Sequence, residues 1–271
     1  MNPPLPSSPE LFPAPRVTPN PWHAFGGIWR LTVRRMFTPM HWLVLAGLLV
    51  ALALVSLGFH TRGNGATFYV MWFQRFYVLF LVPVMAFISG AGAIRDDLKA
   101  GSVDYLFTRP VSRRAFVVFR YLSHLACAQV DFLVAFGVMV GVGLYRQSPG
   151  LLAAVPLLLL AQVITIAAFS AFGLLCGMLT TRYGIIGMFY GGIVEVGIGN
   201  IPTELNRLSM TQQVHAMLVP VIQVGGMTPS EPVAGVLTTV AILVAFAAVM
   251  IAVAAMVFSL REFSGTASAD A

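Results

Sequence analysis

Apolar residues are grouped in long blocks that short polar segments separate, and this pattern predicts six membrane-spanning helices. Most of the blocks reach the roughly 20 residues that a helix needs to cross about 30 Å of hydrocarbon. The fifth block is short and rich in glycine, which permits close helix contact or a bend. Pro83 lies inside the second block, where we expect it to kink the helix. The predicted spans are at about residues 41–59, 69–94, 114–145, 151–180, 185–200 and 233–260.

Residues 22–38, just before the first span, have an amphipathic pattern. Trp22, Phe25 and Trp29 recur at three- and four-residue steps and share one helical face, and Pro39 ends the pattern. Arg30 and Arg34 point away from that face. The pattern favours a helix lying in the membrane interface over an amphipathic helix packed on a soluble core.

Three further segments lie outside the predicted spans. Residues 1–21 contain eight prolines, so we expect a disordered cytoplasmic tail. Residues 201–231 mix polar and apolar positions, which predicts one or two short amphipathic or re-entrant helices between spans five and six. Residues 261–271 form a small polar tail. The transmembrane domain therefore covers residues 39–260.

Composition restricts the class of protein. Hydrophobic residues make up 58% of the 271 positions and charged residues 10%, whereas a soluble domain carries about 25% charged residues. We therefore expect an all-α integral membrane protein. The net charge of +6 does not point to nucleic acid, because the basic residues lie at the ends of the apolar blocks. Twelve of them fall on one side of the predicted topology and four on the other, which places both termini in the cytoplasm.

Motifs for nucleotide or metal chemistry are absent from the sequence. The only lysine, Lys99, does not belong to a GxxxxGK[ST] loop. The sequence has no HExxH motif, no Cys/His cluster and no GxSxG elbow. We expect no catalytic, cofactor or metal site in this chain. Any energy-driven work would use an ATPase on another chain or an ion gradient.

A few polar residues fall at membrane depth, where burial is costly and frequently functional. Asp131 lies midway along the third span, and Gln162 and Thr165 on the fourth span are its expected neighbours. A hydrogen-bonded contact between helices is the more conservative interpretation. A place on a substrate or proton path is the alternative.

Other ionisable residues have simpler interpretations. Glu195, near the outer end of the fifth span, is a possible path residue or a partner of Arg207. We expect His124 to be a hydrogen-bonded packing residue. Arg75 and Arg120 are expected to extend to opposite membrane interfaces.

The densest polar interlude, residues 94–113, lies between spans two and three. A glycine followed by Ser102 is suited to end one helix and cap a short one at 103–108. Pro110 would end that helix, and Ser112 would cap the third span. The local pattern fits a coupling element and a plain polar hairpin equally well.

The sequence IRDD at 94–97, followed by SVDYLFTRPVSR at 102–113, resembles the cytoplasmic signature of type-2 ABC exporter permeases. The layout is similar too, with an amphipathic N-terminal helix, six spans and an apolar-polar excursion between spans five and six. This family often has glutamate where Asp97 and Asp104 stand in this chain. The sequence similarity is specific only over 94–113.

The resemblance implies a half-transporter of the bacterial cytoplasmic membrane. It would pair with a second permease chain, identical or homologous, and dock on a cytosolic ABC ATPase that binds ATP and Mg²⁺. The helix at 103–108 would enter the ATPase, the helix at 22–38 would lean on the same partner, and residues 201–231 would form extracytoplasmic gate helices. The residues so marked for ATPase coupling are Asp96, Asp97, Ser102, Val103, Tyr105, Leu106, Arg109, Pro110 and Arg113.

Two rival functions follow from the residues. A membrane-embedded enzyme would use Asp131, Glu195 or His124, although these residues form no recognised catalytic pattern. The second rival function is that of a non-transporting scaffold or a gradient-driven carrier. Carriers usually contain repeated halves with broken helices, and the sequence shows no such repeat.

Overall fold

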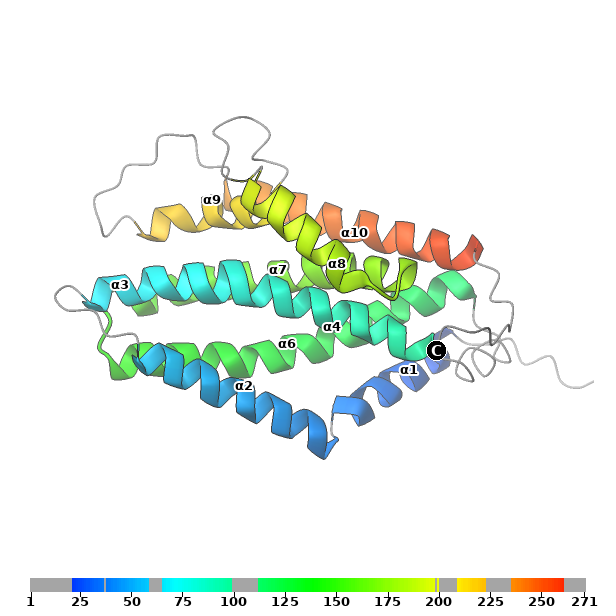
Figure 1. Cartoon of the computed structure of the whole chain (residues 1–271), viewed down its shortest axis with the longest axis horizontal. Helices are drawn as coiled ribbons and strands as arrows, with labels where there is room; N and C mark the ends of the chain where they lie inside the picture. Colours follow the sequence, from blue (N-terminus) through cyan, green and yellow to red (C-terminus); the bar gives the residue numbers. More distant parts are fainter. Residues whose placement is uncertain are drawn as a thin grey trace, which may run out of the picture.

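The computed structural model of this chain describes residues 21–36, 38–58, 65–98, 112–197, 199, 209–222 and 235–260, which form helices and short connections (Figure 1). The helices are α1 (Pro21–Met36), α2 (Pro39–Gly58), α3 (Gly65–Trp72), η1 (Phe73–Leu81), α4 (Val82–Asp97), α6 (Arg113–Tyr145), α7 (Leu151–Leu179), α8 (Tyr183–Phe189), η2 (Tyr190–Gly197), α9 (Met210–Ile222) and α10 (Val236–Leu260). Of the tail predicted at 1–21, residues 1–20 lie outside the described residues and Pro21 begins α1; the tail predicted at 261–271 lies outside them entirely.

Five apolar helices in the described part of the chain are long enough to cross a membrane. They are α2, the continuous helix from Phe68 to Asp97, α6, α7 and α10. Their positions confirm the predicted first, second, third, fourth and last spans within a few residues. The segment predicted as the fifth span forms α8 and η2, a shorter apolar helix from Tyr183 to Gly197.

Helix α7 lies at the centre of the bundle, with α4, α6, α9 and α10 packed against it. Glycines bring α4 and α7 into close contact. A Cβ atom added at Gly173 would lie 2.2 Å from the carbonyl oxygen of Phe87, and one at Gly177 would lie 2.5 Å from that of Ala91. A Cβ at Gly90 would meet the α7 backbone at 2.4 Å. Only glycine permits the two helices to come so close. Such close van der Waals packing holds helices together in a lipid environment, where the hydrophobic effect does not drive them together.

The second span changes its helical register before Pro83. Residues 73–81 form the π-helical segment η1, and the N–H of Val82 still bonds to the carbonyl of Tyr77, five residues earlier. Pro83 has no N–H, so an ordinary α-helical bond is lost at this point. The structure thus has a π-helical segment just before Pro83, the residue at which the sequence predicts a kink. This segment turns Phe73, Tyr77 and Val78 into the core, where all three are fully buried.

Large apolar side chains are exposed along the spans, among them Leu43 (69%), Leu54 (64%) and Leu237 (82%). Such a surface is unsuited to water but matches a hydrocarbon solvent. Charged residues instead lie at the end of the bundle where α4 ends and α6 begins, with Arg95, Asp96 and Asp97 on α4 and Arg113 and Arg114 on α6. The sequence predicts this end, called the loop end below, to be cytoplasmic.

Candidate functional site

The polar segment 94–113 connects α4 to α6 at the loop end. Asp96 and Asp97 form the last turn of α4, and Arg113 begins α6. The Oγ of Ser112 accepts a hydrogen bond from the N–H of Ala115 at 3.3 Å, which confirms the predicted cap. The predicted coupling helix lies outside the described residues, together with Ser102, Val103, Tyr105, Leu106, Arg109 and Pro110.

A buried carboxylate lies directly beside this segment. Asp97 is 5% exposed. Its Oδ2 lies 2.6 Å from Nε of Arg120 on α6, and its Oδ1 accepts a hydrogen bond from Arg35 on α1 at 3.0 Å. One carboxylate therefore holds arginines from two other helices.

Arg120 is itself buried, with 3% of its surface exposed. Its Nη1 donates to Oγ1 of Thr32 on α1 at 2.6 Å, and its Nη2 donates to the carbonyl of Ala93 on α4 at 2.9 Å. The prediction that Arg120 extends to an interface is wrong, because the neighbouring helix supplies its counter-ion inside the protein. We call Thr32, Arg35, Asp97 and Arg120 the ion-pair cluster.

The two halves of the cluster differ in strength. The Asp97 and Arg120 side chains are 6% and 3% exposed, so removing one would strand the other charge at a cost of about 3–5 kcal/mol. The Arg35 side chain is 40% exposed, and solvent reduces its contribution to about 1 kcal/mol or less. The buried pair therefore fixes how α4 meets α6, and Arg35 adds α1 to them.

Apolar contacts support the same joint. The ring of Phe25 meets that of Phe119 on α6 edge to face, at 5.5 Å between centroids. Ile28 packs against an apolar cluster that includes Val117 and Phe116 of α6. The predicted interfacial residues thus divide, since Phe25 faces the protein while Trp22 is 74% exposed. Trp29, Arg30 and Arg34 are exposed as well.

Thr38 forms the corner between α1 and α2. Its hydroxyl donates to the carbonyl of Arg35 at 3.0 Å and accepts from the N–H of His41 at 3.4 Å. It therefore closes α1 and caps α2, and Pro39 occupies the first helical position, which its ring favours. The predicted break at Pro39 is confirmed.

Asp131 has a different partner from the one expected. Its Oδ1 lies 3.3 Å from Nε2 of His41, near the start of α2. Gln162 instead accepts a hydrogen bond from the hydroxyl of Tyr77 at 2.9 Å, and Thr165 bonds within its own helix. The expected neighbours of Asp131 were therefore wrong. The interpretation as a polar contact between helices agrees with the His41 pairing.

Glu195 holds the start of α9. Its carboxylate accepts hydrogen bonds from the hydroxyl of Ser209 at 2.6 Å and from the backbone N–H groups of Met210 and Thr211 at 3.2 and 3.0 Å. These N–H groups have no partner within the helix, and a negative charge there also complements the helix dipole. The proposed partner Arg207 lies outside the described residues.

The family model of the ABC-2 family transporter protein matches residues 50–263, most of the chain. This chain belongs to the ABC-2 transporter family. No curated protein matches it.

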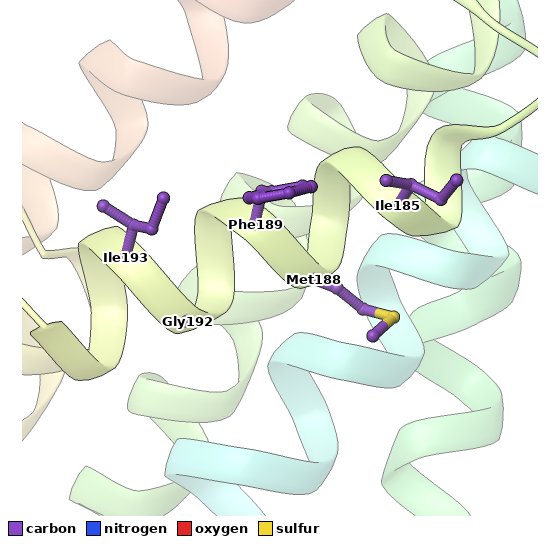
Figure 2. A pocket seen from close by; sticks show the side chains of 5 residues that line it. All are labelled: Ile185, Met188, Phe189, Gly192 and Ile193. Carbon is purple, nitrogen blue, oxygen red and sulfur yellow. The ribbon is translucent and has the colours of Figure 1, made fainter.

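Membership of the ABC-2 family makes the chain a membrane component of transport. One surface of this ABC-2 protein is unusually open. Helix α8 and segment η2 have no buried residue, and their exposed side frames a shallow apolar depression of about 300 Å³. Figure 2 shows Ile185, Phe189 and Ile193 along one side of this helix and Met188 pointing away from them.

The sequence interpretation missed Thr32, Arg35 and His41, and it gave Arg120 no partner. A signal for Asp97 was present: Gly90, Ile94 and Asp97 follow the helical spacing of the buried face of α4. An acid on a buried face requires a cation. The Nε2 of His124 is buried without a hydrogen-bond partner among the described residues, so this nitrogen lacks the bond expected of it.

Proposed function

We propose that this chain is the membrane-spanning subunit of an ABC exporter, driven by a separate cytosolic ATPase that binds ATP and Mg²⁺. The segment between α4 and α6 is the point at which the ATPase applies force. The protein lies in a bacterial cytoplasmic membrane with six spans, α8 and η2 forming the fifth, and with both termini in the cytoplasm.

The ion-pair cluster is the observation that carries this proposal. Residues 99–111 join α4 to α6 in the sequence, and Asp97 and Arg120 hold those two helices together within one or two turns of that segment. Thr32 and Arg35 join α1 to the same pair. A displacement of the segment that joins α4 to α6 would therefore move three helices as one body, which is the rigid-body transmission that switching proteins use.

The exposed surface of α8 and η2 supports a second permease chain as a partner. Its glycines Gly191 and Gly192 have open space where a Cβ atom would stand, so another helix can approach closely. A path formed between two chains would use this surface together with α9, whose start Glu195 fixes. Two copies of this chain, or this chain and a homologue, would form such a path.

Co-purification tests the ATPase interaction. We expect a Tyr105→Ala/Arg109→Glu variant to fold and insert normally but to lose its ATPase subunit. An Arg182→Glu variant is the matched control, because Arg182 is exposed in the turn between α7 and α8, outside the coupling segment. Retention of the ATPase by the double variant would refute the proposed docking element.

The rival functions have less support. An embedded enzyme would bring Asp131 and Glu195 to one centre, but Asp131 pairs with His41 while Glu195 binds the start of α9. A scaffold or a gradient-driven carrier does not require the ion-pair cluster to connect helices next to the segment between α4 and α6. Neither alternative accounts for the ion-pair cluster.

A further inference from the structure

Helix α1 has a strongly basic outer face. Arg30 and Arg34, one turn apart, are both exposed, and the helix contains no acidic residue. Neither arginine contacts a carboxylate among the described residues, whereas Arg35, one position further, turns inward to Asp97. The outer face therefore presents two adjacent guanidinium groups without a counter-ion from the described part of the protein.

The flank beside this basic face is aromatic. Trp22 is 74% exposed and Trp29 is 37% exposed, seven residues apart and so on the same side of the helix. Indole rings favour the level of lipid headgroups, where one edge stays wet and the body rests on hydrocarbon. The helix thus combines an exposed pair of cations with two exposed tryptophans on the adjoining face.

The connection to α2 places this open side at the membrane boundary. Helix α1 ends at Met36, and the first span begins at Pro39. Figure 1 shows α1 at the loop end, meeting α2 at a corner outside the bundle. Because α2 is long and apolar enough to cross a membrane and begins five residues after Arg34, a membrane around the bundle would place Arg34 at the depth of the headgroups.

We propose that Arg30, Arg34 and Trp29 form a binding site for anionic phospholipid headgroups. A phosphate or carboxylate of the lipid supplies the counter-charge that no described carboxylate provides, and guanidinium groups suit bidentate contact with phosphate. Each arginine near an anionic surface contributes about a fivefold preference for it. Zwitterionic lipids carry no net charge and receive little of this preference.

The site has a regulatory consequence that rests on the proposed function. The inner side of α1 carries Thr32 and Arg35, two members of the ion-pair cluster. An anionic lipid that holds the outer side of α1 in place also holds these two residues against Arg120 and Asp97. Anionic lipid therefore strengthens the link through which the ATPase moves the permease.

Tryptophan quenching tests the lipid site without the ATPase. The chain has four tryptophans, so a Trp42→Phe/Trp72→Phe variant keeps only Trp22 and Trp29 as reporters. The full chain is reconstituted in vesicles of equal parts phosphatidylcholine and phosphatidylglycerol, with one or the other lipid brominated near the top of its acyl chains. We expect brominated phosphatidylglycerol to quench several-fold more efficiently.

The same quenching measurement on variants without the two arginines tests whether these residues select the anionic lipid. Arg30→Gln/Arg34→Gln, in the same tryptophan background, is expected to equalise quenching by the two lipids, and Arg182→Gln is expected to change nothing. Equal quenching in the parent, or a preference that survives both substitutions, would overturn the lipid site. Absence of quenching by both lipids would also overturn it, by showing that α1 faces away from the bilayer. Loss of ATPase binding in the Tyr105→Ala/Arg109→Glu variant is measured separately, so the two proposals can fail independently.

Discussion

Replacing Arg120 by methionine would remove one side of a buried ion pair and leave its carboxylate in place. Asp97 would keep only Arg35, at 3.0 Å and 40% exposed. Stranding a buried charge costs about 3–5 kcal/mol, and the remaining partner lowers that cost by up to about 1 kcal/mol. We therefore expect Arg120→Met to lower the free energy of unfolding by about 3 kcal/mol.

The companion variant removes both charges. In Asp97→Leu/Arg120→Met no charge is stranded, and Thr32 still donates to the carbonyl of Ile28 at 2.9 Å. Apolar replacements of buried ion pairs are frequently neutral or stabilising, so we expect the double variant to lie within about 1 kcal/mol of the parent. Denaturant titration of the purified chain in micelles measures both values. A single variant as stable as the double one would refute the reasoning, because the pair would then not be desolvated.

Three further predictions concern packing and polar contacts. Gly173→Ala adds a methyl group 2.2 Å from an α4 carbonyl oxygen and should cost about 1–3 kcal/mol of stability. Gly137→Ala, on an open helix surface, should cost nothing and is the control. Thermal unfolding of the two variants measures the difference. Glu195→Ala should cost about 1–2 kcal/mol and speed amide hydrogen exchange in the first turn of α9, and unchanged exchange would exclude the capping role. Asp131→Asn should lower stability by about 1 kcal/mol through its contact with His41 while ATPase binding persists; loss of transport at unchanged stability would instead indicate a path residue.

The spans and the caps could be predicted because their causes are local. Blocks of apolar residues determine α2, α6, α7 and α10, and Ser112 caps α6 through a hydrogen bond only three residues away. The amphipathic pattern of 22–38 also predicts α1. Helix periodicity does not show which side of such a helix meets protein and which meets lipid. The pattern therefore puts Phe25 on one face with Trp22 and Trp29 but does not reveal its contact with Phe119.

The cluster could not be predicted because its partners are distant in sequence. Arg35 and Asp97 are 62 positions apart, and Thr32 and Arg120 are 88 apart. Pairing at such distances depends on how the helices are arranged. The arrangement of α4 against α7 depends in turn on glycine contacts that hydropathy does not reveal. Similarly, Glu195 caps α9 from 15 positions earlier in the chain, and no local pattern shows that these two segments meet.

The most direct test of the central claim is a distance measurement on the permease bound to its ATPase. Spin labels at His23→Cys on α1 and Tyr145→Cys at the far end of α6 occupy exposed positions, and the native Cys127 and Cys176 are buried. We predict that ATP changes the distance between the labels in the parent. In Asp97→Leu/Arg120→Met the ATPase should stay bound, but ATP should leave that distance unchanged. An equal ATP-induced change in both proteins would contradict transmission through the ion-pair cluster.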